Sequence, residues 1–216
     1  MNLPNKLTIF RIILVPIIVI IYYCGAQGLI DGTFLNIPVV NWLIVAIFAI
    51  ASYTDHLDGK LARKNNIITT FGKFADPLAD KILVLATMLI LVEDSKLPAW
   101  IPIIVLFREF VVSGYRLIAV EQGGKVIAAN IWGKIKTVTQ MIAIILMLLS
   151  NFSYFSFIFR VSSVNEMYQN SASIYMSTGE YIINILGTVL MTISVIATIF
   201  SGWTYIKEGK ELFKDF

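Results

Sequence analysis

Four long stretches without a charged residue constrain this chain more than any other feature. They are 19, 23, 23 and 26 residues long and cover residues 12–30, 32–54, 137–159 and 181–206. A helix of about 20 apolar residues crosses the hydrocarbon core of a bilayer. Only 14% of the 216 residues are charged, against about one quarter in soluble domains. The chain is therefore predicted to be an integral membrane protein.

Two shorter apolar stretches, residues 82–92 and 97–107, become long enough to span a membrane when the polar residues beside them are included. We therefore predict an all-α bundle of six transmembrane helices that forms one domain over residues 1–216. The expected helices cover residues 7–25, 38–64, 76–92, 98–120, 130–149 and 181–206. An even number of spans places both termini on one side of the membrane. The segment 150–180 then lies on the opposite side, and its sequence indicates no function.

Positive charge is distributed unequally between the two sides. Of the 17 lysines and arginines, all except Lys96, Arg108 and Arg160 fall on the side that holds the termini. Cytoplasmic loops carry the excess of positive charge, so the termini are predicted to be cytoplasmic in a multi-pass protein of the inner (cytoplasmic) membrane. This basic face suits anionic lipid headgroups and phosphorylated solutes. No soluble segment is long enough to build a nucleic-acid groove, so no nucleic-acid partner is expected.

Four aspartates interrupt the apolar pattern at two neighbouring helix ends. Asp55 and Asp58 are three residues apart near the end of the second helix, and Asp76 and Asp80 are four apart at the start of the third. Each spacing places a pair on one helical face. The short connection predicts antiparallel neighbours, so the four carboxylates are expected to converge at the cytoplasmic face. Oxygen ligands without His or Cys favour Mg²⁺, Mn²⁺ or Ca²⁺ over Zn²⁺. The alternative is that the acids are salt-bridged anchors at the membrane edge.

The aspartates belong to a longer pattern that extends over 26 positions. It reads Asp55-x2-Asp58-Gly59-x2-Ala62-Arg63-x8-Gly72-x3-Asp76-x3-Asp80. This pattern resembles the signature of the CDP-alcohol phosphatidyltransferase family at every fixed position. The resemblance implies a six-helix, homodimeric membrane enzyme with a cytoplasm-facing active site, which displaces CMP from a CDP-linked donor with an alcohol. It also implies two divalent ions, Mg²⁺ or Mn²⁺, held by the four aspartates, with Asp80 as the candidate general base.

The same resemblance suggests a binding site for the CDP-lipid. Gly59 and Ala62 would leave room for the cytidine, and Arg63 would pair with the diphosphate, because its planar donors match that group. Gly72 is also a candidate residue for binding the CDP-lipid. Asn5 and Thr8, near the start of the first helix, are candidate contacts to the nucleotide. Capping of that helix is the alternative that the sequence leaves open for them.

The chain is also similar, almost end to end, to one branch of that family, the bacterial phosphatidylglycerophosphate synthases. The similarity rests on residues 2–11, 108–110, 113–116 and 133–137. It implies transfer of the phosphatidyl group from CDP-diacylglycerol to glycerol 3-phosphate, with membrane lipids as further partners. The alternatives within the family are enzymes with another acceptor, namely cardiolipin synthase and the phosphatidylinositol-type and phosphatidylserine synthases.

Four basic residues are candidates for binding the acceptor's phosphate. They are Arg108, Arg116, Lys134 and Lys136. A dianionic phosphate favours such a cationic pocket. Arg108 could instead form a buried pair with Glu109, and the lysines could be ordinary cytoplasmic loop residues.

A function of another class, divalent cation transport, also uses intramembrane acids. Transport would require acids near the middle of the bilayer and interrupted helices. The four aspartates instead gather at one face, which favours the enzyme.

Overall fold

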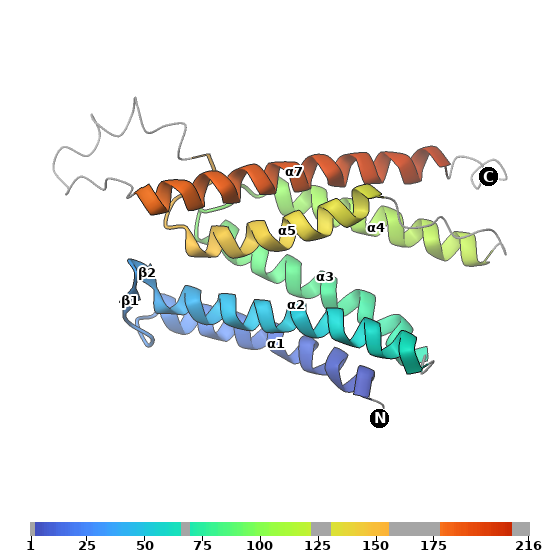
Figure 1. The fold of residues 1–216 in the computed structure, drawn as a ribbon, viewed down its shortest axis with the longest axis horizontal. Helices are drawn as coiled ribbons and strands as arrows, with labels where there is room; N and C mark the ends of the chain where they lie inside the picture. The colour runs from blue at the N-terminus through green and yellow to red at the C-terminus, as the bar shows by residue number, and fades with distance from the viewer. Residues whose placement is uncertain (1–2, 66–69, 122–130, 156–177, 209–216) are drawn as a thin grey trace.

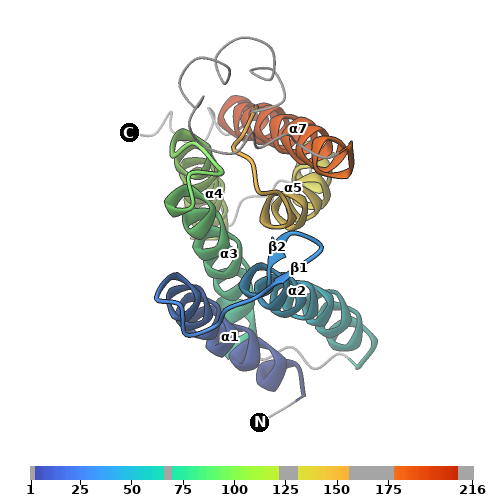
Figure 2. The same ribbon diagram turned by 90° about the vertical axis from the view of Figure 1, so that its left-hand side faces the viewer.

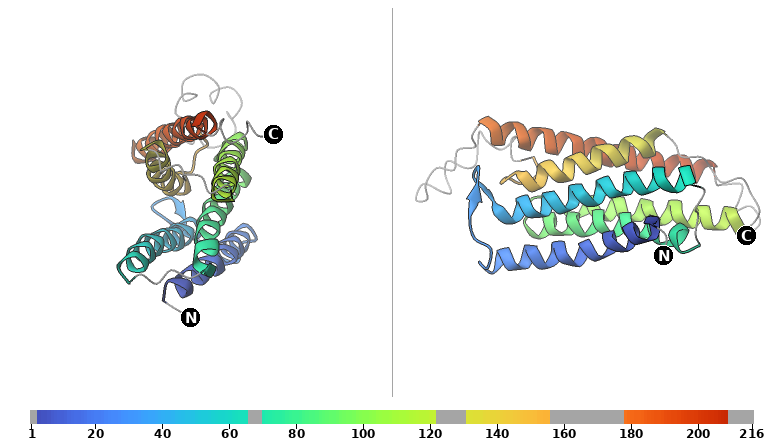
Figure 3. Two further views of the ribbon diagram at one scale, coloured as in Figure 1. Left: turned by 90° about the vertical axis from the view of Figure 1, so that its right-hand side faces the viewer. Right: turned by 60° about the horizontal axis from the view of Figure 1, so that its bottom comes forward.

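The computed structural model describes residues 3–65, 70–121, 131–155 and 178–208. In these ranges six helices run back and forth along the long axis of the molecule (Figure 1, Figure 3). They are α1 (Leu3–Ala26), α2 (Val39–Asn65), α3 (Thr70–Glu93), α4 (Trp100–Glu121), α5 (Ile131–Leu149) and α7 (Thr178–Glu208). Because successive helices point in opposite directions, α1 begins and α7 ends at the same end of the bundle, which we call the terminal end.

The predicted helices are confirmed within four residues at each end, with one exception. Helix α3 begins at Thr70, six residues before the predicted start. The prediction followed the apolar run, whereas the helix continues beyond that run into polar sequence. Asp76 therefore lies in the second turn of α3 and not at its start.

Three helices of the described part are long and apolar enough to cross a membrane. They are α1, α5 and α7, and their apolar spans cover Asn5–Ala26, Ile131–Leu149 and Thr178–Lys207. Helices α3 and α4 have 24 and 22 residues, which is sufficient for a core of about 30 Å at about 1.5 Å per residue. The charged residues that these two helices contain set them apart from the other three, so the count of six spans stays a prediction.

The outer surface of the bundle is apolar, whereas its interior contains polar side chains. Ile20, Ile103 and Trp203 are 60%, 64% and 65% exposed, while Thr87 and Thr198 are fully buried. In water such large apolar faces would be unstable without a partner. Between helices in lipid, polar side chains serve as interhelical contacts. This distribution fits a bundle surrounded by lipid.

The bundle consists of two closely packed groups. Helix α1 packs extensively on α2 and α3, and α5 packs on α7 (Figure 2). Between the groups, the main contact among the described residues is that of α2 with α5, and α3 adds smaller contacts with α4 and α5. Gly187 of α7 allows the second group to pack closely, since a Cβ atom there would lie 3.2 Å from Met147 Sδ. Small residues at such points are typical of membrane helix interfaces.

A short hairpin that the sequence analysis did not predict connects α1 to α2 at the end opposite the termini. Strands β1 (Thr33–Phe34) and β2 (Ile37–Pro38) pair antiparallel. The two turn residues, Leu35 and Asn36, have φ angles of 55° and 62°, as a two-residue hairpin turn requires. Asn151 Nδ2 donates a hydrogen bond of 2.7 Å to the Asn36 carbonyl. The hairpin thus ties the first group of helices to the loop after α5.

A polar cluster at the same end connects α1, the α3–α4 loop and the loop after α5. Tyr22 Oη donates to Asp94 at 2.9 Å, and Lys96 Nζ lies 3.3 Å from Asp94 Oδ2. The Tyr154 amide donates to the Lys96 carbonyl at 3.0 Å. Burial lowers the pKa of the Lys96 ammonium, although the charge of Asp94 opposes this shift. Of the segment 150–180, residues 156–177 lie outside the described ranges.

The close contact between α1 and α2 gives a first prediction, at Gly25. A Cβ atom at this position would lie 3.0 Å from Val40 Cγ1 and 3.1 Å from Val40 Cβ. We expect Gly25→Ala to lower the free energy of unfolding by about 1–3 kcal/mol, the usual cost of overpacking, as measured by thermal unfolding in detergent. Gly114→Ala is the control, because no atom of the described residues outside its own helix backbone lies within 4 Å of a Cβ there. An equal loss of stability in both variants would contradict this account of the α1–α2 contact.

Candidate active site

The four aspartates lie on α2 and α3 at matching distances from the terminal end. Asp55 is ten residues before the end of α2, and Asp80 is ten residues after the start of α3. At a rise of about 1.5 Å per residue, both lie about 15 Å along their helices from the α2–α3 connection. Asp58 and Asp76 are seven and six residues from it. The two helices run antiparallel. Asp55 and Asp80 therefore lie at one depth of the bundle, and Asp58 and Asp76 lie at another.

The side chains of these aspartates lie outside the described part of the structure, so their convergence stays a prediction. The same holds for the side chains of Ala62 and Arg63 and for the surroundings of Gly59 and Gly72. Their backbone positions are helical, with Gly72 in the first turn of α3. Among the side chains that are described, no three His, Cys, Asp or Glu residues form a group that could hold a metal ion.

Helix α1 contributes a buried polar stripe beside the aspartate-bearing helices. Asn5 is 9% exposed, and Thr8 and Arg11 are fully buried. The spacing of three residues places neighbouring members of this stripe on one side of α1, and α1 packs on α2 and α3. Arg11 was predicted only as one of the basic residues of the cytoplasmic side. The signal that could have shown its burial is an arginine directly before a 19-residue charge-free run.

A second group of charged residues, whose side chains the structure describes, surrounds Glu109. The Glu109 carboxylate of α4 contacts three cationic side chains, which come from three helices. Arg108 Nη1 lies 2.9 Å from Glu109 Oε1, and Lys81 Nζ lies 3.4 Å from Glu109 Oε2. Lys136 of α5 forms a salt bridge with Glu109 Oε1. Lys81 also donates a hydrogen bond to Ser113 Oγ. We call Lys81, Arg108, Glu109 and Lys136 the Glu109 cluster.

Arg108 joins the Glu109 cluster to α7. Its Nη2 donates a hydrogen bond to Ser201 Oγ, and its guanidinium carbon lies 5.8 Å from the centre of the Tyr205 ring. The pair with Glu109, which the sequence left open, is therefore present. Gly133 and Gly202 border this side chain, because a Cβ atom at Gly133 would lie 3.6 Å from Arg108 Nη2 and one at Gly202 would lie 3.4 Å from Arg108 Cγ, both ordinary contact distances.

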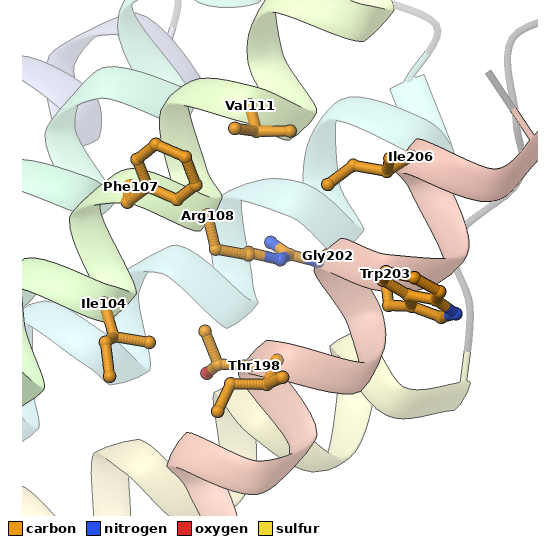
Figure 4. A pocket seen from close by; sticks show the side chains of 9 residues that line it. Ile104, Phe107, Arg108, Val111, Thr198, Gly202, Trp203 and Ile206 are labelled. Atoms are coloured by element: carbon orange, nitrogen blue, oxygen red, sulfur yellow. The ribbon is translucent and has the colours of Figure 1, made fainter. Parts of the chain in front are cut away.

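Arg108 also lines a groove of about 250 Å³ between α4 and α7 (Figure 4). The other lining residues are mostly apolar; they are Ile104, Phe107, Val111, Thr198, Ile199, Gly202, Trp203 and Ile206. Arg108 Nε is buried and has no hydrogen-bond partner among the described residues. Two of the three guanidinium nitrogens are thus partnered, Nη1 by the Glu109 carboxylate and Nη2 by the Ser201 hydroxyl.

The structure separates two of the predicted phosphate-binding lysines. Lys136 is 5% exposed and belongs to the Glu109 cluster, whereas Lys134 is exposed. Residues two apart in a helix differ by about 200° around its axis and do not face the same way. The side chain of Arg116, the fourth candidate, lies outside the described residues. The sequence analysis predicted this helix over residues 130–149, so the spacing of the two lysines already contained the signal, but it was not applied to them.

The sequence comparisons agree with the pattern of aspartates and basic residues. Residues 1–200 match the CDP-alcohol phosphatidyltransferase family. The chain belongs to this family. It is therefore an enzyme of the CDP-alcohol phosphatidyltransferase class and a membrane protein.

Individual relatives in this family cover nearly the whole chain. A Bacillus subtilis protein named CDP-diacylglycerol–glycerol-3-phosphate 3-phosphatidyltransferase is 39% identical, covering 99% of this chain and 97% of its own length. A Rickettsia bellii protein of the same name is 32% identical over 98% of this chain and 97% of its own length. A Haemophilus influenzae protein, also of that name, is 42% identical over 66% of this chain and 73% of its own. The family resemblance inferred from the aspartate pattern is confirmed.

The separation of the two lysines can be tested by cysteine labelling. In a Cys24→Ser background, we expect Lys134→Cys to react with a maleimide at least about tenfold faster than Lys136→Cys, because a thiol must be accessible to react. Rates would be measured on the purified protein in mild detergent. Labelling after denaturation in SDS is the control and should be equal for both variants. Equal rates in the folded protein would contradict the orientation of α5.

Proposed function

We propose that this enzyme transfers the phosphatidyl group of CDP-diacylglycerol to the sn-1 hydroxyl of glycerol 3-phosphate, giving phosphatidylglycerophosphate and CMP. The observation that supports this most strongly is 39% identity over nearly the full length of a relative named for this reaction. The Glu109 cluster is the structural counterpart, because it supplies the cationic surroundings that a phosphorylated acceptor needs.

The donor set of the four aspartate positions fits divalent cations. Four carboxylates at two matched depths of antiparallel helices provide hard oxygen ligands, which suit Mg²⁺ or Mn²⁺. Asp55, Asp58, Asp76 and Asp80 would hold two ions. When bound, such ions neutralise the diphosphate and the charge that develops in phosphoryl transfer. The role of the protein is to orient the donor against them.

The remaining residues of the family pattern would position the CDP-lipid. Gly59, Ala62 and Gly72 leave room for the nucleotide, and Arg63 pairs with the diphosphate. The buried Asn5 and Thr8 lie on α1, which packs on α2 and α3. The Asn5 amide and the Thr8 hydroxyl can both donate and accept hydrogen bonds, which suits contacts to the cytidine.

The acceptor requires a base and an anion site. Asp80 would accept the proton of the attacking hydroxyl through an oxygen that remains free toward the alcohol. Arg108, Arg116, Lys134 and Lys136 are the candidates for the acceptor phosphate, and Lys136 and Arg108 are the two that the described residues bring together. Binding the phosphate in this way aligns the hydroxyl with the donor and lowers the entropic part of the barrier.

The enzyme would act at the cytoplasmic face of the inner membrane. Six spans, cytoplasmic termini and a homodimeric assembly complete this proposal. The helices alternate in direction, so the start of α1 and the end of α7 lie on one side. Most of the basic residues fall in the sequence segments expected on that side.

The acceptor specificity can be tested directly with the purified protein. It would be supplied with CDP-diacylglycerol, Mg²⁺ or Mn²⁺, and one acceptor at a time: glycerol 3-phosphate, phosphatidylglycerol, inositol or serine. We expect CMP release coupled to phosphatidylglycerophosphate formation with glycerol 3-phosphate alone. We expect Arg116→Ala to raise the KM for glycerol 3-phosphate by about tenfold, because a charge-assisted contact to phosphate is lost. Reaction with another acceptor in place of glycerol 3-phosphate would refute the assignment within the family.

The metal proposal predicts a different kind of loss. We expect Asp76→Asn to reduce kcat by at least about 1,000-fold, because a metal ligand acts in the transition state, and to shift the half-saturating Mn²⁺ concentration upward. Asp31→Asn, which removes an exposed carboxylate at the hairpin end, is the control and should retain wild-type turnover. Near wild-type turnover of Asp76→Asn at low Mn²⁺ would remove the metal proposal.

A further inference from the structure

One carboxylate inside the bundle is shared by three cations, and this ratio is unusual. Lys81 of α3, Arg108 of α4 and Lys136 of α5 all contact Glu109. The four side chains are between 6% and 33% exposed. Their formal charges sum to +2. The described residues around them add the hydroxyls of Ser113 and Ser201, which carry no charge.

Among the described residues, no second anion forms a salt bridge with these three cations. An ionised side chain in a membrane helix costs about 2.5–3.5 kcal/mol on insertion scales. A stable buried pair needs one cation for one anion, and each further cation adds repulsion and desolvation. A fold that only required α3, α4 and α5 to be held together would be more stable with one pair, or with apolar residues. The charge balance of the described residues therefore leaves room for an anion that comes from outside the chain.

The charge of the missing anion matches a phosphate monoester, which carries close to two negative charges near neutral pH. Arg and Lys donors recognise such a group through several charge-assisted hydrogen bonds. A neutral alcohol would leave the surplus charge unbalanced, so the cluster discriminates between acceptors as well as binding one.

The Glu109 cluster adjoins the segment that carries the proposed base. Lys81 follows Asp80 directly in α3, so the two positions are about 100° apart around the helix and about 1.5 Å apart along it. Lys81 Nζ is held by Ser113 Oγ and Glu109 Oε2, both from α4. A phosphate bound by Lys81 would thus be held from the same turn of α3 that carries Asp80.

We propose that Glu109 is a positioning residue that holds Lys81, Arg108 and Lys136 together as a preformed receptor for the phosphate of the acceptor. The inference rests on the proposed function and deepens it in two respects. It adds Lys81, which contacts Glu109, to the phosphate-binding residues, and it gives Glu109 a role although its own charge repels phosphate. Without the carboxylate the three ammonium and guanidinium groups would repel one another and separate.

The test uses Glu109→Gln and Glu109→Asp in the full-length protein, purified in detergent and assayed with CDP-diacylglycerol. We expect Glu109→Gln to raise the KM for glycerol 3-phosphate at least about tenfold, with less than about a twofold change in the KM for CDP-diacylglycerol. The inhibition constant of inorganic phosphate against glycerol 3-phosphate should rise in parallel. Glu109→Asp keeps the charge and should recover part of the loss. Asp31→Asn is the control, and it should change neither KM.

A purely structural role of Glu109 predicts another result. Both KM values, kcat and the thermal unfolding temperature would then change together, and this outcome would overturn the proposal. An unchanged KM for glycerol 3-phosphate in Glu109→Gln would overturn it as well.

If Glu109→Gln does not fold, Lys81→Met and Lys81→Arg decide the question. We expect Lys81→Met to raise the KM for glycerol 3-phosphate selectively and Lys81→Arg to restore it; equal KM values in Lys81→Met and the wild type would overturn the proposal. Failure of the wild-type enzyme to use glycerol 3-phosphate would refute the proposed function instead, which keeps the two failures distinguishable.

Discussion

A charge placed between helices in lipid is stable only if another charge or a strong hydrogen-bond partner meets it, and this constraint organises the molecule. At the hairpin end, Lys96 is balanced by Asp94, which Tyr22 also contacts. Farther into the bundle, Glu109 contacts cations from three helices. Many large apolar side chains face outward, where lipid requires no polar partner. Charged side chains therefore link the helices at a few defined points.

Much of this fold could be predicted because lipid leaves few solutions for the backbone. With no water to satisfy its polar groups, a chain that crosses the membrane as single segments must do so as helices, so the charge-free runs predicted α1, α2, α5 and α7 closely. Helix α3 was predicted too short because its first two turns are polar and have no apolar run to mark them. The hairpin at residues 33–38 was missed because its turn residues, Leu35 and Asn36, are not the glycine-containing pair that usually marks such turns.

The candidate site has two parts, the four aspartates and the Glu109 cluster, and the sequence predicted the first better than the second. The spacing of the aspartates follows from one helix at a time, so the sequence was sufficient to assign each pair to a face. Two of the three salt bridges of the Glu109 cluster join residues far apart in sequence, namely Glu109 with Lys136 and with Lys81. No periodicity in one helix contains that information. The sequence therefore identified Lys136 and Arg108 as cations of interest, but it could not show that one carboxylate holds both of them and Lys81.

The close packing of α5 and α7 connects lipid-facing structure to the proposed acceptor site. Gly133 and Gly202 are the positions where a side chain would meet Arg108, and Ser201 is the residue that holds its Nη2 atom. Small residues at these positions allow a long guanidinium to lie between helices at a depth where it can reach Glu109 from the side of α7. The small residues of α5 and α7 therefore border Arg108, which belongs to the proposed acceptor site, whereas the proposed metal ligands lie on α2 and α3. Lys81 of α3 contacts Glu109 of α4, and it is the residue at which these two proposed parts meet.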